Sequence, residues 1–162
     1  MGNKRILMQR GDGTVIPSGM IGETITSVCS SNAVQATPTI GTYYFPTNSP
    51  SVSLPAGKWL ISYIALTEMT GSGWSTSDAP VCTVRLRDTT NSVTVADSTT
   101  AIALVPTLMV QSVSGCMELN LTATATVRLE ISAKAWLGSP TVANIAFRGD
   151  QGTTKIVAAC IG

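Results

Sequence analysis

The sequence contains no histidine, and only 12% of its residues are charged. Without histidine, the triads that activate a serine or cysteine nucleophile cannot form, and the usual zinc-ligand spacings are absent. The acidic residues are scattered along the chain, so no pair can be nominated for the two-carboxylate chemistry of a glycosidase. We therefore predict that the protein is not an enzyme and holds no metal or other cofactor.

Long apolar runs and clustered basic residues are also missing. No segment has the roughly 20 apolar residues that a bilayer-spanning helix needs. Apart from Lys4-Arg5 and the Arg85/Arg87 pair, the basic residues are scattered, whereas nucleic-acid binding depends on clustered Lys and Arg that neutralise phosphates. The sequence thus favours neither a nucleic-acid partner nor insertion into a membrane.

Apolar and small polar residues make up most of the chain. Hydrophobic residues account for 44% of the 162 residues, and the formal net charge is +1. This length fits one domain with one core. A chain with so few charges covers its surface poorly, which favours burial of part of that surface against other subunits. We predict an oligomer.

Four cysteines are widely spaced and never form a C-x-x-C pair: Cys29, Cys82, Cys116 and Cys160. Each is flanked by small or apolar residues. This pattern favours small buried side chains in a protein assembled in the cytosol over a disulfide framework.

The stretch 52–66 is the one around which the fold is organised. After a Pro-Ala-Gly turn, Trp59, Ile61 and Tyr63 point to one side of a strand, while Leu60 and Ile64 point to the other. A strand with one wet face would carry polar residues at every second position. We therefore expect a strand covered on both sides, either in the centre of a sheet or at a subunit contact.

Strand-like stretches separated by Gly, Pro, Ser or Asn clusters fill the rest of the chain, and no stretch has a helical period. The predicted strands cover residues 21–30, 39–45, 58–66, 81–87, 93–96, 101–110, 113–121, 123–135, 142–148 and 153–161. This rhythm predicts an all-β sandwich of the jelly-roll type. The first 22 residues, crowded with turn-formers, predict an extended arm ahead of a head domain at 23–162.

Two polar loops, 71–80 and 88–92, carry the candidate binding residues. Trp74 lies in the middle of the first, and a tryptophan on a polar loop is a good binding candidate, although capping a hydrophobic edge is the alternative. The candidate receptor or glycan contacts are Trp74, Ser75, Asp78 and Asn91.

Two further motifs have a functional and a structural interpretation. The aromatic run 43–45 predicts core or interface packing, with a sugar-stacking platform as the alternative. The tripeptides Arg-Gly-Asp at 10–12 and 148–150 have the spelling of an adhesion signal, but Gly-Asp is also ordinary turn chemistry, which we favour.

At this point a resemblance to a known family appears. Residues 13–23 resemble the lead-in of many tailed-bacteriophage fibre and decoration proteins, where Gly-Thr-x-x-Pro-x-Gly-x-x-Gly-Glu precedes a β-rich head. Residues 54–63 are similar to the Pro-x-Gly-x-aromatic strand of those heads and of the tumour-necrosis-factor and complement-globular-head jelly rolls. Residues 152–162 resemble the last strand of the phage heads, while the middle of the chain matches only in its strand rhythm.

The resemblance implies a homotrimeric jelly-roll head in a phage virion, assembled in the cytoplasm of the bacterial host. In such trimers, apolar strands of the subunits meet on the axis, which makes Trp59, Ile61 and Tyr63 the candidate trimer core. The arm becomes the candidate attachment to other virion proteins of the capsid or tail, with Lys4, Arg5, Arg10 and Asp12 as its charged residues. The family has no catalytic residues to transfer.

The resemblance departs from the family in one respect, since no coiled coil or shaft precedes the head in this sequence; we expect either a small capsid-bound protein or a fragment of a longer fibre. Two roles remain within the family: the knob of a fibre or spike that contacts a host-surface glycan or protein, or a capsid decoration protein anchored by its arm. The alternative from another class is a free-standing lectin-like module, with Trp74, Tyr43 and Tyr44 stacking on sugars.

Overall fold

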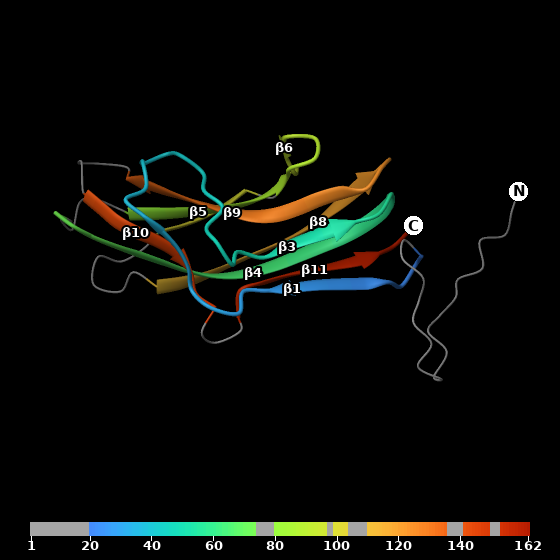
Figure 1. Ribbon diagram of the computed structural model, residues 1–162, viewed down its shortest axis with the longest axis horizontal. Helices are drawn as coiled ribbons and strands as arrows, with labels where there is room; N and C mark the ends of the chain where they lie inside the picture. Colours follow the sequence, from blue (N-terminus) through green and yellow to red (C-terminus); the bar gives the residue numbers. More distant parts are fainter. Residues whose placement is uncertain (1–19, 74–79, 97–98, 104–109, 136–140, 150–152) are drawn as a thin grey trace, which may run out of the picture.

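A computed structural model describes residues 20–73, 80–96, 99–103, 110–135, 141–149 and 153–162. These residues form eleven strands and no helix. Sheet A contains β1 (Thr24–Val28), β2 (Ala33–Ala36), β4 (Gly57–Ser72), β8 (Val110–Leu121), β10 (Thr141–Phe147) and β11 (Lys155–Cys160). Sheet B contains β3 (Ser51–Leu54), β5 (Pro80–Asp88), β6 (Val93–Thr94), β7 (Thr100–Ala103) and β9 (Ala125–Ala135). The sheets stack face to face (Figure 1), confirming the predicted all-β jelly-roll sandwich.

Strand β4 is the central element of sheet A and runs the length of the molecule (Figure 1). One of its edges pairs with β8, and the other pairs first with β11 and then with β10. Strands β1 and β2 extend the sheet by pairing with β11 and β10. The expectation of a central strand is therefore confirmed, although β4 continues to Ser72, beyond the predicted end at residue 66.

The core lies between the two sheets and is built from alternate residues of each long strand. In β4, Trp59 and Ile61 are fully buried and Tyr63 is 2% exposed. Both polar groups in this row are satisfied, because Trp59 Nε1 donates to the Pro55 carbonyl at 3.0 Å and the Tyr63 hydroxyl lies 2.7 Å from Thr100 Oγ1. From sheet B, the inward residues of β9 complete the core, as the period-2 pattern of that strand predicted.

The prediction of a strand at 39–45 is wrong. This stretch forms turns, with Gly41 in the left-handed region at φ 84°, and only Tyr44 makes an isolated bridge to Ile131. Pro38 and Pro46 flank it and cannot donate to a ladder, which limits regular pairing. The short strand β2, just before it, was not predicted.

The head begins with a turn that joins its first and last strands. Glu23 N donates to the Met20 carbonyl at 3.0 Å, and Gly22 N donates to the Cys160 carbonyl at 2.9 Å. Strand β1 starts directly after this turn, and residues 1–19 of the predicted arm lie outside the described residues. Among the described residues there is no helix with the length and apolar character needed to span a bilayer.

Candidate functional site

None of the described residues covers the face of sheet A that points away from sheet B. We define it by three rows of paired residues across β1, β11, β4 and β8: Thr24–Ala159–Leu60–Glu118, Thr26–Val157–Ser62–Cys116 and Val28–Lys155–Ile64–Ser114. We call these twelve residues the assembly face.

The assembly face is rich in apolar and small side chains. Val28, Leu60 and Ile64 are 47%, 40% and 42% exposed. Its acidic residue, Glu118, is paired with Lys58 at 2.7 Å at the margin. Six of the twelve side chains are apolar, and exposed apolar side chains gathered on one face of a sheet make that face a candidate contact with another molecule. The sequence predicted that this strand has apolar residues on both of its sides. The structure adds that the exposed ones lie on the side of β4 that carries Leu60 and Ile64.

The prediction that Trp59, Ile61 and Tyr63 form the contact between subunits is wrong. All three point into the sandwich and are already buried inside one chain. Burial within the chain leaves them no surface to lose on association, so they stabilise the head itself. The described residues also do not cover β4 on both sides, because Leu60 and Ile64 on its other side are exposed.

The cysteines divide between the core and the assembly face. All four are free; Cys29, Cys82 and Cys160 are buried, as predicted, whereas Cys116 is exposed. Burial raises the pKa of Cys82 to about 12, which keeps that thiol protonated and unreactive. Cys116 differs because it occupies an outward position of β8, opposite Ser62.

Asn91, one of the candidate receptor contacts, lies in a turn that is fixed by a buried carboxylate. One oxygen of Asp88 accepts hydrogen bonds from the backbone N–H groups of Thr90 and Asn91 at 2.9 and 3.0 Å, and the other accepts from Asn91 Nδ2 at 2.7 Å. Thr126 N donates to Thr90 Oγ1 at 3.0 Å, which ties the turn to β9. The turn is thus preorganised, as a binding loop on a rigid scaffold should be.

Beside this turn lies a hollow of about 280 Å³, between the turn and the β8–β9 connection. Its polar lining includes Thr90, Asn91, Asn120, Thr122 and Thr124. The volume of this hollow is close to the lower end of the range for small-molecule sites, about 300 Å³, so it can hold one group of sugar size. Hydroxyl and amide side chains are suited to the hydroxyl groups of a sugar.

The aromatic run 43–45 meets the arginines of sheet B. The Arg85 guanidinium lies 3.7 Å from the centroid of the Tyr43 ring, and that of Arg128 lies 4.4 Å from the centroid of the Phe45 ring. Each of these rings therefore has one face covered by a cation. The Tyr44 hydroxyl accepts a hydrogen bond from Thr39 N at 2.8 Å. A packing role fits these contacts better than an open sugar-stacking platform.

The second Arg-Gly-Asp motif is built into the fold at its first two residues. Arg148 forms an ion pair with Glu68 at 2.6 Å. At Gly149, a Cβ atom would collide with the backbone carbonyls of Cys29 and Ser31, and Gly149 N donates to Asn32 Oδ1 at 3.0 Å. These contacts support the turn interpretation over exposure as an adhesion signal.

Several predicted residues lie outside the described part of the chain. They are the loop residues Trp74, Ser75 and Asp78, the arm residues Lys4, Arg5, Arg10 and Asp12, and the first Arg-Gly-Asp motif at 10–12. Within the described ranges, no cluster of three or more His, Cys, Asp or Glu residues is arranged to hold a metal ion.

No protein-family model matches the sequence, and no curated protein matches it. Among solved structures, the fold is similar to chains of the infectious bursal disease virus Gt and Gx strains, each with a TM-score of 0.50, 12% identity and coverage of 86% of this chain and 32% of that chain. It is also similar to the Eiger TNF of S. frugiperda, with a TM-score of 0.46, 10% identity and coverage of 86% and 93%. The chain thus spans about a third of the viral chains, at 32% of their length. At these identities the similarity is one of fold.

Proposed function

We propose that this protein is a structural component of a bacteriophage virion, a jelly-roll head that assembles as a homotrimer. The observation that carries the proposal is the assembly face, where Val28, Leu60 and Ile64 are 40–47% exposed and no described residue covers them. The sequence resemblance to phage fibre and decoration heads supplies the phage context, and viral particles occur among the structures with a similar fold.

The role of the head is non-enzymatic, and its partners are other copies of itself and other virion proteins. The chain has no histidine, and the described residues present no metal cluster. Attachment to the capsid or tail is assigned to the arm, with Lys4, Arg5, Arg10 and Asp12 as its charged contacts. Host contact is assigned to the end of the head that carries Asn91.

Two measurements test this proposal. Light scattering on the purified protein at micromolar concentration is expected to give three times the chain mass of 16.8 kDa; a monomer would contradict the trimer. Co-sedimentation with virus shells lacking the protein, and with host cells, separates the two virion roles. Binding to shells that depends on residues 1–19 indicates a decoration protein, whereas binding to cells without that dependence indicates a receptor-binding knob.

Thiol labelling provides a local test of the buried surface. Cys116 lies on the assembly face, so its reaction with an aromatic disulfide reagent is expected to be slow in the trimer. The other three cysteines are buried in each chain and should react only after unfolding. Fast release of one thiol equivalent from a trimeric sample, abolished by Cys116→Ser, would place the contact between subunits elsewhere.

The hollow beside Asn91 supports a lectin-like function as the second candidate, whether in a virion or in a free-standing module. Thr122 is exposed at its rim, so Thr122→Arg is expected to fill it and reduce binding to any sugar found on a glycan array by tenfold or more. Thr42→Arg adds the same side chain at an exposed threonine outside the hollow and serves as the control. Equal binding by both variants would remove the hollow from consideration.

A further inference from the structure

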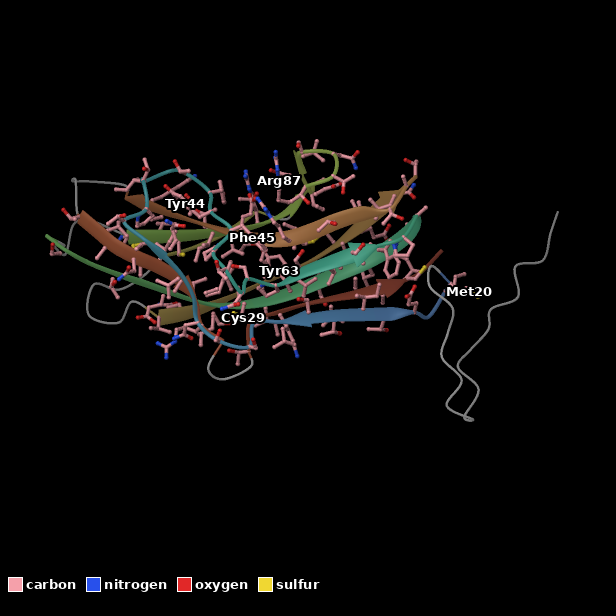
Figure 2. The ribbon with its side chains drawn as sticks, in the orientation of Figure 1. Met20, Cys29, Tyr44, Phe45, Tyr63 and Arg87 are labelled. Carbon is pink, nitrogen blue, oxygen red and sulfur yellow. The ribbon has the colours of Figure 1, made fainter. Side chains whose placement is uncertain are left out.

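The outer face of sheet B, opposite to the assembly face, carries an excess of positive charge. Strand β5 contributes Arg85 and Arg87, and β9 contributes Arg128 and Glu130. Figure 2 shows Arg87 and Phe45 on the side of sheet B that faces away from sheet A. Three guanidinium groups therefore surround one carboxylate on this face.

The carboxylate is shared between two of the arginines. One oxygen of Glu130 accepts from Nε and Nη2 of Arg85 at 2.9 and 2.7 Å. The other oxygen accepts from the same two atoms of Arg128 at 3.0 and 2.7 Å. With only 5% of the Glu130 side chain exposed, both oxygens are fully engaged and have nothing left to offer the third arginine.

Arg87 is that third arginine, and it is placed directly opposite Arg128 in the β5–β9 ladder. Like charges at directly paired positions destabilise a sheet. Among the described residues, no carboxylate lies within ion-pair distance of Arg87, which is only partly exposed. On its other side, Arg87 is paired with Thr94 of β6, so a hydroxyl-bearing residue continues the row.

We propose that the row Arg128–Arg87–Thr94 binds an oxyanion, a carboxylate or sulfate group carried on an acidic polysaccharide. An oxyanion beside the two guanidinium groups would offset their like charge and accept hydrogen bonds from Arg87 and from the N–H groups of Arg128 that Glu130 leaves free. Arg128 is held in place for this by Glu130 on one side and by the Phe45 ring on the other. Little conformational entropy remains to be lost there on binding.

The arrangement fits an acidic polysaccharide better than a nucleic acid. Nucleic-acid binding typically neutralises several phosphates, about 6–10 in well-studied cases, and adds bases stacked on aromatic rings. Here the described residues leave one arginine of this face without a carboxylate partner, and Tyr43 and Phe45 each already hold a guanidinium against the ring. A single charged group of a polysaccharide is enough to pair with that arginine.

The experiment measures binding of the full chain to dextran sulfate by calorimetry at about 150 mM salt, where long-range attraction is screened. Binding to dextran sulfate but not to neutral dextran is expected, with affinity about tenfold lower in Arg87→Gln, the loss typical of one charge-assisted contact. Arg87→Lys should recover the affinity only in part, because an ammonium lacks the planar pair of donors. Lys134→Gln, the control, removes one exposed charge from β9 outside the row and outside the assembly face, and should change affinity less than twofold.

Four results would overturn the proposal: no binding by the wild type, equal losses in Arg87→Gln and Lys134→Gln, tighter binding of a single-stranded DNA oligonucleotide with the same loss at Arg87, or displacement of the polymer by millimolar inorganic phosphate. Folding is controlled by thermal unfolding. Dextran sulfate should raise the midpoint of the wild type but not that of Arg87→Gln, whose unliganded midpoint should not fall. Because this row and the assembly face are on opposite sides of the sandwich, failure of one proposal leaves the other intact.

Discussion

Gly115→Val is expected to lower the free energy of unfolding by about 3 kcal/mol, the upper end of the range for overpacking a core. Gly115 of β8 is directly opposite Tyr63 of β4, and the tyrosine ring lies over it. A Cβ atom at Gly115 would be 2.7 and 2.9 Å from two ring carbons. The ring has little freedom to withdraw, because Tyr63 is buried and its hydroxyl is bonded to Thr100.

Thermal or chemical unfolding measures this effect. For a chain of this length, a loss of about 3 kcal/mol corresponds to a midpoint lower by about 6–12 °C. In a Tyr63→Leu background, where the ring is absent, the penalty of the valine should largely disappear, since valine favours a strand more than glycine does. An unchanged midpoint in the single variant, or the same penalty in both backgrounds, would show that the ring does not set the requirement for glycine.

Ile64→Asp is expected to convert the proposed trimer into monomers. Ile64 is 42% exposed on the central strand β4, in an outer row of the assembly face. Burying a carboxylate costs several kcal/mol even beside its cross-strand neighbour Lys155, because the ammonium must then be desolvated with it, and each trimer would contain three copies of the change. The measurement is the molar mass by light scattering across a range of protein concentrations, together with the rate of Cys116 labelling, which should rise.

Ile40→Asp provides a closely matched control. Ile40 is the same residue type with the same 42% exposure, but it lies in the turn region 37–42 and outside the assembly face. Its aspartate variant should remain trimeric with slow Cys116 labelling. Dissociation of both variants, or of neither, would argue against this face as the contact.

The long strands of the fold could be predicted from the sequence because one physical rule governs them. In β9, Val127, Leu129 and Ile131 face the core while the residues between them face outward, and this period of two is visible in the letters. The inward face of β4 could be predicted for the same reason. Such strands bury a continuous stripe, so local pattern and tertiary packing agree.

The elements that were mispredicted depend on partners distant in the sequence. Residues 39–45 are aromatic and β-branched, yet the chain bends at Gly41 and only Tyr44 reaches β9. Strand β2, with the sequence Ala-Val-Gln-Ala, has little strand propensity and forms because β10 offers it an edge. Neither outcome can be read from local composition.

The sequence predicted which strand forms the contact surface, but not which side of that strand is buried and which is exposed. Apolar residues on both sides of β4 predicted cover on both sides, and only the stacking of the sheets decides that Trp59 is core while Leu60 is uncovered. The turn containing Asn91 was predicted. The hollow beside it also depends on Asn120 at the end of β8 and on Thr122 in the β8–β9 connection, which are distant from the turn in the sequence. The placement of Arg87 opposite Arg128 could not be predicted without the register of β5 against β9.

The position of β11 has a consequence for how the protein is made. This strand is inserted between β1 and β4, so residues 155–160 pair with both residues 24–28 and residues 59–64. During synthesis, β1 and this part of the edge of β4 therefore have no pairing partner until β11 has been made. Long-range pairing of this kind slows folding, and the open edge of β4 can meanwhile pair with neighbouring nascent chains. A chaperone that shields this edge until β11 has been made would thus favour a high yield of folded heads.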